Sequence, residues 1–496
     1  MKLLSLSRSG AELIPVEVEI NLTPGLPQIS FLGLPDAGLK ESVQRIKSAL
    51  REQGFQLPPA HQVLVQLRPS YLRKSSRGLD LAVAVGVLLE TGQISIQQIE
   101  SFLKNKNGPS GTLFFYGELT LKGELLLPDD SDEGELPVGA AMVTGPQGIS
   151  PDDSTKLDLP FTSLRLFCLR DFLTEKWQWQ EAVSDCWRRP EVQIKEFPSA
   201  AAELGMVIAA GEHSALIAGP PGGGKSTLVD CVGPWLEEPN SLEFRKAKRF
   251  NRKVGRDLSW RPILKPHHSI TPMAMIGGGS SVWAGEITRA HAGVLIMDEL
   301  LEYNPVIQEA LREPLEAGTI SISRAGASKT FPASLLLLAT TNLCPCGRFV
   351  PRRGEERKCR CLVKDRRKMI SRLKGPFVDR FTIFSLSDGW TKDEKNISTK
   401  EIYERVLGAV EFRKKRNQWM PNAKLDPAAI EESLTPFQKQ HFIVNLRLPR
   451  RRKMSSLRVA RTLADLEKSE LIQDHHLQRA MHYCVETFRM IEEWEG

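Results

Sequence analysis

The chain has 496 residues, 41% of them hydrophobic and 26% charged, so it is long enough for about three domains and holds enough apolar side chains to fold. This composition excludes a wholly disordered protein. The longest apolar runs fall well below the roughly 20 residues that span a bilayer, and the N-terminus lacks a signal-peptide pattern. We therefore expect a cytoplasmic protein without a membrane partner. The net charge of +7 is modest, so the distribution of basic residues is more informative than their sum.

The first part of the chain alternates between strand-like and helix-like patterns. Strands are indicated by alternating apolar and polar residues, and helices by apolar residues at helical spacing. The expected strands are VEVEINL (16–22), QVLVQLRP (62–69) and TLFFYGEL (112–119), and the expected helices cover 36–54 and 79–92. The sequence therefore predicts an N-terminal α/β domain, followed by a connection that ends near residue 192.

A glycine-rich motif marks the start of a second domain. GPPGGGKS (219–226) fits G-x-x-x-x-G-K-[ST] directly after the apolar strand ALIA (215–218) and before a helix-like stretch. Glycine N–H groups can surround phosphate oxygens, Lys225 can contact the β and γ phosphates, and the Ser226 hydroxyl can bind magnesium. The motif predicts an ATP site formed by Gly219, Pro220, Pro221, Gly222, Gly223, Gly224, Lys225, Ser226 and Thr227.

Polar residues at the ends of two later apolar strands complete the expected site. GVLIMDE (293–299) delivers Asp298 as a magnesium ligand and Glu299 as the group that polarises the attacking water. SLLLLATTN ends at Asn342, whose amide can orient that water. GPFVDRF supplies Arg380, which is either a surface charge or an arginine finger that reaches the ATP of a neighbouring subunit.

Four of the eight cysteines form two C-x-C pairs: Cys344, Cys346, Cys359 and Cys361. Four thiolates suit tetrahedral zinc, although reduced thiols without metal, an iron–sulfur cluster and a regulatory disulfide stay open as alternatives. The other cysteines are scattered, as in a reduced cytosolic protein.

Basic residues are concentrated after residue 344, and the last hundred residues have helical apolar spacing. Between residues 344 and 374, twelve Lys or Arg accompany three acids, and RKKR (413–416) and RLPRRRK (447–453) follow. Such clusters suit a polyanion, or they are solvated faces or subunit contacts. Helices are expected over 399–416, 427–442, 457–469 and 475–494.

The order of these motifs resembles the ComM/YifB family, which are magnesium-chelatase-like AAA+ ATPases with an N-terminal Lon-protease-like domain, over nearly the whole chain. The segments that carry the resemblance include FLGLPDAGLKESVQRIKSAL, GLDLAVAVG, YGELTLKGEL, GPPGGGKS, PHHSITPMAMIGGG, GEITRAHAGVLIMDEL, LREPLEAGTISISRAG, FPASLLLLATTNLCPCG and LRVARTLADL. The resemblance implies a Lon-protease-like (S5-like) α/β domain at 1–172, a linker at 173–192, an AAA+ P-loop αβα core at 193–390 and a C-terminal α-helical lid at 391–496.

The resemblance also implies roles for single residues. Residues 219–227 correspond to Walker A, Asp298 and Glu299 to Walker B, Asn342 to sensor 1, Arg380 to the arginine finger and Arg451 to sensor 2. The segment 266–279 resembles the helix-2 insert and 319–332 the pre-sensor 1 hairpin, which face the central pore of a hexamer. The DNA contacts expected from these segments and from the arginines between the cysteines are Lys329, Arg348, Arg352 and Arg353.

Two departures from the family pattern are visible. Leu301 stands where the family usually has proline, and Gly78, Leu79, Asp80 and Leu81 stand where active Lon-type domains carry G-P-S-A. Because no serine nucleophile is present at these four positions, we expect no peptidase activity.

The function that the resemblance implies is that of a hexameric DNA motor driven by ATP and Mg²⁺, with structural Zn²⁺. It would act as a helicase or branch-migration enzyme on single-stranded or branched DNA during recombination and natural transformation, together with recombination proteins. One alternative is a chelatase-like ATPase that remodels a protein partner. Another is an ATP-dependent DNA-binding scaffold without useful turnover.

Overall fold

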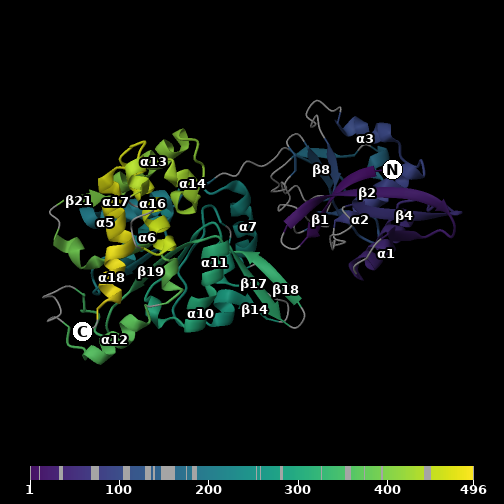
Figure 1. The fold of residues 1–496 in the computed structure, drawn as a ribbon. Helices are drawn as coiled ribbons and strands as arrows, with labels where there is room; N and C mark the ends of the chain where they lie inside the picture. The colour runs from purple at the N-terminus through teal and green to yellow at the C-terminus, as the bar shows by residue number, and fades with distance from the viewer. Residues whose placement is uncertain are drawn as a thin grey trace. The chain divides into compact units, whose positions relative to one another are not determined.

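The computed structural model divides into two compact units, Met1–Asp185 and Cys186–Gly496, and each unit is described by itself (Figure 1). The structure describes residues 2–494 except 10–11, 33–36, 69–77, 104–111, 129–135, 138–139, 147–161, 175, 181–186, 253, 257, 280–282, 325–326, 352–358, 374, 393–394 and 441–447. None of the helices in this described part of the chain has the length and apolar character needed to cross a lipid bilayer.

The first unit is built on a mixed eight-stranded sheet with the order β10-β9-β8-β5-β1-β2-β4-β3. Its strands are β1 (Lys2–Ser9), β2 (Glu12–Pro24), β3 (Ile29–Leu32), β4 (His61–Arg68), β5 (Leu113–Phe115), β8 (Ala141–Thr144), β9 (Ser163–Arg165) and β10 (Gln178–Gln180). The helices are α1 (Ala37–Glu52), α2 (Leu79–Glu90), α3 (Ile96–Leu103) and α4 (Asp171–Thr174). Helix α2 is the buried centre, and at Gly86 a Cβ would lie 2.3 Å from Ile20 of β2, so glycine permits this close packing.

Asp80 lies in α2, at the position where the resemblance would place a Lon-type nucleophile. Its carboxylate is fully buried and accepts hydrogen bonds from the Ser42 hydroxyl (2.5 Å), Arg45 Nε (2.9 Å) and the Leu119 amide (3.3 Å). Burial raises the pKa of Asp80, although Arg45 and Ser42 act in the opposite direction. The carboxylate therefore joins α1, α2 and the short strand β6 (Glu118–Leu119).

Two sequence expectations need correction in this unit. The strand expected over 112–119 is interrupted, because Gly117 turns away to donate its amide to Gly78 and only then continues as β6, which pairs with β7 (Leu125–Leu126). The segment 173–192 is not wholly a linker, since β10 within it pairs antiparallel with β9. The expected strands 16–22 and 62–69 and the expected helices 36–54 and 79–92 correspond to β2, β4, α1 and α2.

The second unit contains a parallel five-stranded sheet with the order β13-β16-β19-β12-β20. Its strands are β12 (Ala215–Ala218), β13 (Ile263–Leu264), β16 (Val294–Met297), β19 (Leu336–Thr341) and β20 (Ile383–Leu386). Successive strand residues enter two different cores: Ile217 and Ile296 pack with one set of helices, whereas Leu216 and Leu295 pack with another. The sheet is therefore covered on both faces, as expected for parallel strands.

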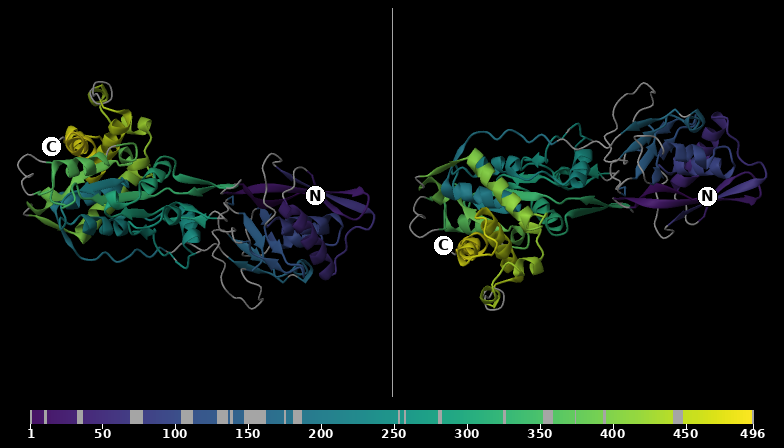
Figure 2. Two further views of the ribbon diagram at one scale, coloured as in Figure 1. Left: turned by 90° about the horizontal axis from the view of Figure 1, so that it is seen from below. Right: turned by 90° about the horizontal axis from the view of Figure 1, so that it is seen from above.

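Helices from distant parts of the chain form these two covering layers (Figures 1 and 2). One layer contains α5 (Ser199–Gly211), α6 (Lys225–Trp235), α13 (Thr399–Lys415) and α16 (Arg450–Leu466). The other contains α8 (Pro272–Ile276), α9 (Glu286–Arg289), α10 (Pro305–Ala310) and α12 (Val363–Ser371). Further elements are α7 (Ser241–Arg252), α11 (Arg312–Ala317), the hairpins β14 (Gly277–Gly278) with β15 (Trp283–Ala284) and β17 (Thr319–Arg324) with β18 (Ala327–Pro332), and the pair β11 (Glu196–Pro198) with β21 (Asn396–Ser398).

The C-terminal helices belong to the same compact unit as the parallel sheet, because α13 and α16 both pack on α5. Beyond these, α17 (Asp474–Met481) and α18 (Thr487–Glu492) follow. The helix expected over 427–442 is instead two short helices, α14 (Pro427–Glu431) and α15 (Pro436–Gln438). A new helix starts at Pro436 because Thr435 forms a capping box there and proline cannot continue the preceding helix.

A buried carboxylate holds this helical region together. Asp465 accepts hydrogen bonds from Arg461 (3.0 and 3.2 Å), Arg416 (2.8 and 3.0 Å) and the Asn422 amide (2.8 Å). Both Asp465 and Arg461 are buried, so the charge of Arg461 depends on Asp465 for compensation.

We expect Asp465→Ala to lower the free energy of unfolding by about 3 to 5 kcal/mol, because Arg461 would keep a buried charge without its counter-ion. Chemical denaturation would measure the change. The matched control is Glu432→Ala, an exposed carboxylate of the same region, for which we expect a change within about 0.5 kcal/mol. Equal stability of the two variants would contradict the assignment.

Candidate nucleotide-binding site

The glycine motif forms the loop between β12 and α6. Gly219, Gly222 and Gly224 have φ values of 143°, 79° and 79°, which side chains rarely permit. The loop also lies against Ser387: a Cβ at Gly219 would be 2.4 Å from its hydroxyl oxygen, and a Cβ at Gly223 would be 2.8 Å from it. The loop is therefore shaped by glycine both through backbone conformation and through close packing.

Lys225 lies at the start of α6 and points back into this loop. Its ammonium donates hydrogen bonds to the carbonyls of Gly219 and Pro220, both at 2.7 Å, and lies 3.4 Å from Asn342 Oδ1. Burial lowers the pKa of Lys225, although the carboxylates of Asp298 and Glu299 act in the opposite direction. The structure thus brings the expected phosphate-binding lysine and the expected sensor asparagine together.

Asp298 follows β16 and is surrounded by donors. Its Oδ1 accepts the Ser226 hydroxyl at 3.0 Å and the Thr340 hydroxyl, and its Oδ2 lies 3.2 Å from Lys265 Nζ. Burial alone would raise the pKa of Asp298, but the hydrogen bonds from Thr340, Ser226 and Lys265 outweigh it and hold the pKa below its ordinary value. The carboxylate is therefore kept charged, as a cation ligand must be.

Glu299 is held mainly by its backbone. It adopts the left-handed conformation (φ 56°), and its amide donates to the Thr340 hydroxyl at 3.3 Å. A non-glycine residue in this region is uncommon, and such strain is often found at functional sites. The side chain is 56% exposed, and its carboxylate lies 3.6 Å from His268 Nδ1. Glu299 is therefore positioned by the main chain while its carboxylate faces solvent.

Sequence reasoning missed Lys265, His268 and Thr340. The only local signal for Thr340 was its place on β19, two residues before Asn342. In the parallel register Met297 is paired with Ala339, so Asp298 and Thr340 emerge side by side at the ends of their strands. Lys265 and His268 lie just after the edge strand β13, and Lys265 lines a pocket of about 650 Å³.

Arg380 and Arg451, the two arginines predicted for the site, lie together at Glu316. Arg380 and Arg451 both form ion pairs with Glu316 Oε1, at 2.8 Å for Arg451, and Arg380 also donates to the Pro376 carbonyl at 2.7 Å. Among the described residues, Arg380 and Arg451 form no hydrogen bond with the glycine loop, Asp298 or Asn342. The structure therefore gathers the predicted site residues into two groups.

The neighbouring Arg452 has a different environment from Arg451. It is buried, donates to Asp379 (2.8 Å) and the Phe381 carbonyl (3.1 Å), and its guanidinium lies over the rings of Phe384 and Phe488. Arg451 is exposed. Arg452 is thus a packing residue, whereas Arg451 is accessible.

The four central cysteines lie close together. The Sγ atoms of Cys344, Cys346 and Cys359 are 3.4 to 3.6 Å apart, and Cys361 Sγ accepts the Cys346 amide at 3.3 Å. The Arg348 amide lowers the pKa of Cys346 to about 6, and burial raises the pKa of Cys344 to about 12.

The cysteine segment borders the glycine loop. Gly347 has a φ of 74°, and a Cβ there would lie 2.7 Å from the Pro221 ring and 3.7 Å from the Asn342 side chain. The turn that carries Cys346 therefore packs against two residues of the candidate nucleotide site.

The DNA contacts predicted from the sequence are only partly described. Lys329 is exposed on β18, in a hairpin that touches the smaller hairpin: a Cβ at Gly277 would meet the Ile322 side chain at 2.8 Å. Arg348 is exposed next to the cysteines. Arg352 and Arg353 lie outside the described residues.

Three family descriptions of magnesium chelatase match the chain: subunit ChlI over residues 193–392, the ChlI subunit again over 18–131, and the ChlI C-terminal part over 396–484. A curated relative, the uncharacterised protein YifB of Salmonella typhimurium, is 30% identical over 505 residues, covering 96% of this chain and 95% of that protein. The chain belongs to the ComM/YifB family of magnesium-chelatase-like proteins.

Other relatives cover similar lengths. The competence protein ComM of Haemophilus influenzae is 28% identical over 508 residues, covering 96% of this chain and 95% of that protein. An uncharacterised protein of Mycobacterium tuberculosis (strain H37Rv) is 31% identical over 500 residues, covering 91% and 92%. Membership in this AAA+ family implies ATPase activity with ATP and Mg²⁺. The Ser226 hydroxyl and the Asp298 carboxylate fit magnesium, because both offer the hard oxygen ligands that it prefers.

We expect Thr340→Val to lower the ATPase rate by about 10- to 100-fold, because the side chain that orients Asp298 and the Glu299 amide would lose its hydroxyl without a change of size. The matched control is Thr341→Val, whose hydroxyl donates to the Asn342 carbonyl and, in the described part of the chain, to neither carboxylate of the site; its rate should stay within about twofold of the parent rate. A steady-state ATPase assay measures both. Equal rates for the two variants would refute the role of Thr340.

Proposed function

We propose that this family member is an ATP-hydrolysing, ring-forming DNA motor of the helicase or branch-migration type, acting in recombination and natural transformation. The observation that carries the catalytic part is the meeting of Lys225, Ser226 and Asp298 at the carboxyl edge of the parallel sheet. The relative named competence protein ComM supports the biological setting.

In this proposal each residue of the site has one task. The loop amides and Lys225 hold the phosphates, Ser226 and Asp298 hold Mg²⁺, and Asn342 orients the attacking water. Glu299, exposed beside Asp298, accepts the hydrogen bond of that water. When bound, Mg²⁺ neutralises charge on the β and γ oxygens.

A homo-oligomer, for which we propose a hexamer, explains the second group of residues. Arg380 and Arg451 share Glu316, so both guanidinium groups have a carboxylate partner other than the residues of the P-loop. The γ phosphate of a neighbouring subunit could replace the Glu316 carboxylate as their partner, because phosphate accepts the same charged hydrogen bonds. Arg380 would then serve as the arginine finger and Arg451 as sensor 2.

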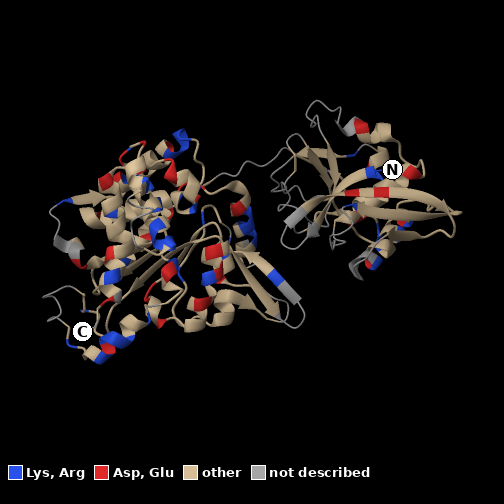
Figure 3. Ribbon diagram, viewed as in Figure 1, with Lys and Arg blue, Asp and Glu red and all other residues tan. Residues whose placement is uncertain are grey.

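The DNA contacts are proposed at the paired hairpins and the cysteine segment. Figure 3 shows Lys and Arg on α12, α7 and the β17–β18 hairpin. Lys329 is exposed on this hairpin and Arg348 is exposed next to the cysteines, and Arg352 and Arg353 are added from the sequence alone. Basic side chains of this kind bind the phosphate backbone of either single-stranded or branched DNA.

We also propose that the four cysteines bind structural zinc. Four thiolates bound to one zinc ion at about 2.3 Å would place their sulfurs about 3.8 Å apart. The observed separations of 3.4 to 3.6 Å between three of the sulfurs are close to this geometry. The turn at Gly347 would then be stiffened by the ion.

The remaining parts of the proposal concern the domains. The first unit is proposed as a Lon-protease-like domain without peptidase activity, since Asp80 is buried and bonded to Ser42 and Arg45 at the position of the missing nucleophile. The helices after residue 390 are proposed as the lid. The cytoplasm is the proposed compartment, with recombination proteins as partners.

We expect forked DNA to stimulate the ATPase several-fold and the protein to displace a strand from it, with binding that weakens as salt rises because counterions are released. Lys329→Ala should weaken binding for all DNA sequences and reduce the slope of log affinity against log salt by about 1. The matched control is Lys176→Ala, an exposed lysine of the first unit.

Glu299→Gln serves as the catalytic control of this experiment, since it should bind ATP and DNA but hydrolyse almost no ATP. Absence of both DNA binding and DNA stimulation in the parent protein would refute the motor and favour remodelling of a protein partner.

We expect about one zinc per chain in the purified protein and its loss in the double variant Cys359→Ser, Cys361→Ser. Elemental analysis measures this directly. Cys168→Ser, which removes a thiol of the first unit, is the control and should keep the metal. Iron in place of zinc, no metal in the parent, or unchanged zinc in the double variant would each overturn the assignment.

A further inference from the structure

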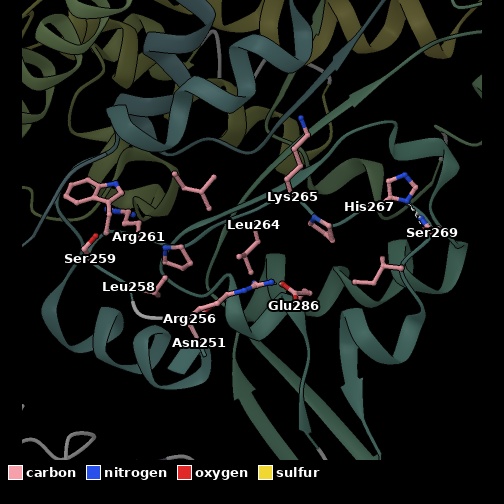
Figure 4. A pocket seen from close by; sticks show the side chains of 15 residues that line it. Asn251, Arg256, Leu258, Ser259, Arg261, Leu264, Lys265, His267, Ser269 and Glu286 are labelled. Atoms are coloured by element: carbon pink, nitrogen blue, oxygen red, sulfur yellow. Dashed lines mark hydrogen bonds and ion pairs between the residues drawn. The ribbon is translucent and has the colours of Figure 1, made fainter. Parts of the chain in front are cut away.

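Lys265 contacts Asp298, the expected magnesium ligand. Neither the sequence motifs nor the family assignment explains why a lysine lies there. Its ammonium lies 3.2 Å from Asp298 Oδ2 and 3.1 and 3.2 Å from the two carboxylate oxygens of Asp230. In Figure 4 its side chain extends away from Glu286 and Arg256, which form a pair of their own across the pocket. Lys265 therefore bridges two carboxylates at the border of the nucleotide site.

These two carboxylates come from the elements that build the site. Asp230 lies four residues after Ser226 in α6, so the two side chains share one face of that helix. Ser226 bonds Asp298 Oδ1, and Lys265 joins Asp298 Oδ2 to Asp230. The result is a closed cycle of contacts between the P-loop helix, the end of β16 and the segment after β13.

We propose that the Lys265 ammonium and Mg²⁺ compete for Asp298, and that Asp230 holds Lys265 when the metal is bound. Both cations need the same carboxylate, and two cations next to one carboxylate repel each other. When Mg²⁺ binds Asp298, Lys265 would lose its contact with Asp298 and keep its contacts with both oxygens of Asp230. Asp298 would then be paired with the metal and Lys265 with Asp230. Lys265 is thus a positioning residue that sets how strongly Mg²⁺ binds.

The inference rests on the nucleotide site of the proposed function and not on its DNA-motor part. The measured quantity is the affinity for a fluorescent, non-hydrolysable ATP analogue in excess Mg²⁺ divided by its affinity in excess EDTA. This ratio reports the contribution of the metal to binding and does not require turnover.

The variants change the ratio in opposite directions. Lys265→Met removes the competitor, so the ratio should rise about three- to fivefold, the size expected for a partly exposed ion pair. Asp230→Asn leaves Lys265 with Asp298 alone, so the ratio should fall by a similar factor. Lys265→Arg keeps a cation between Asp230 and Asp298, so its ratio should lie nearer to that of the parent than the ratio of Lys265→Met does. A purely structural role would instead lower the ratio in both of the first two variants.

The double variant Lys265→Met, Asp230→Asn separates exchange from simple long-range charge effects. If Asp230 acts only through Lys265, the double variant should have the same ratio as the single variant Lys265→Met. Additive effects, a shift of both single variants in the same direction, or ratios equal to that of the parent would overturn the inference. Failure of the parent to bind the analogue in either buffer would refute the nucleotide site itself.

Discussion

The candidate site depends on the register of the parallel strands β16 and β19. Because Met297 pairs with Ala339, Asp298 leaves β16 beside Thr340 on β19, and the same hydroxyl reaches both Asp298 and the Glu299 amide. A slip of one residue would turn Thr340 to the opposite face of the sheet. It would break the hydrogen bonds that keep Asp298 charged and Glu299 in its left-handed conformation, so the pairing of apolar strands controls the chemistry at their ends.

A short segment without regular structure connects this site to the hairpins. Lys265 bonds Asp298, the Pro266 carbonyl accepts the Tyr303 hydroxyl at 2.5 Å, and His268 lies near Glu299. The chain then continues through α8 to β14, which packs against the hairpin that carries Lys329. The chain thus connects both carboxylates to the proposed DNA-binding surface through this segment and α8, so a shift at the nucleotide site has a physical route to that surface.

The sequence predicted those parts of the site that are encoded locally. The glycine motif, Asp298 and Asn342 each follow an apolar strand directly, so residue type and spacing were sufficient to predict that they lie close together. Lys265 could not be found in this way, because its contact with Asp298 depends on β13 being the neighbour of β16 in the sheet. The convergence of Arg380 and Arg451 on Glu316 likewise joins elements that are far apart in the chain. The broken helix at Pro436 was a different case, since its signal was present in the sequence.

Two segments without regular structure border the candidate nucleotide site. Residues 265–268 contact Asp298 and Glu299, and residues 344–347 pack against the glycine loop. The second reaches Pro221 and Asn342 through Gly347, where any side chain would collide with the proline ring. A segment of this kind has few backbone hydrogen bonds of its own, so its shape depends on what holds its side chains. Cys344 and Cys346 lie in this segment, within sulfur contact of Cys359. Whether these thiols are free or bound to a metal therefore affects the packing of Gly347 against the P-loop. This effect is independent of any contact between DNA and the arginines that lie between the cysteines.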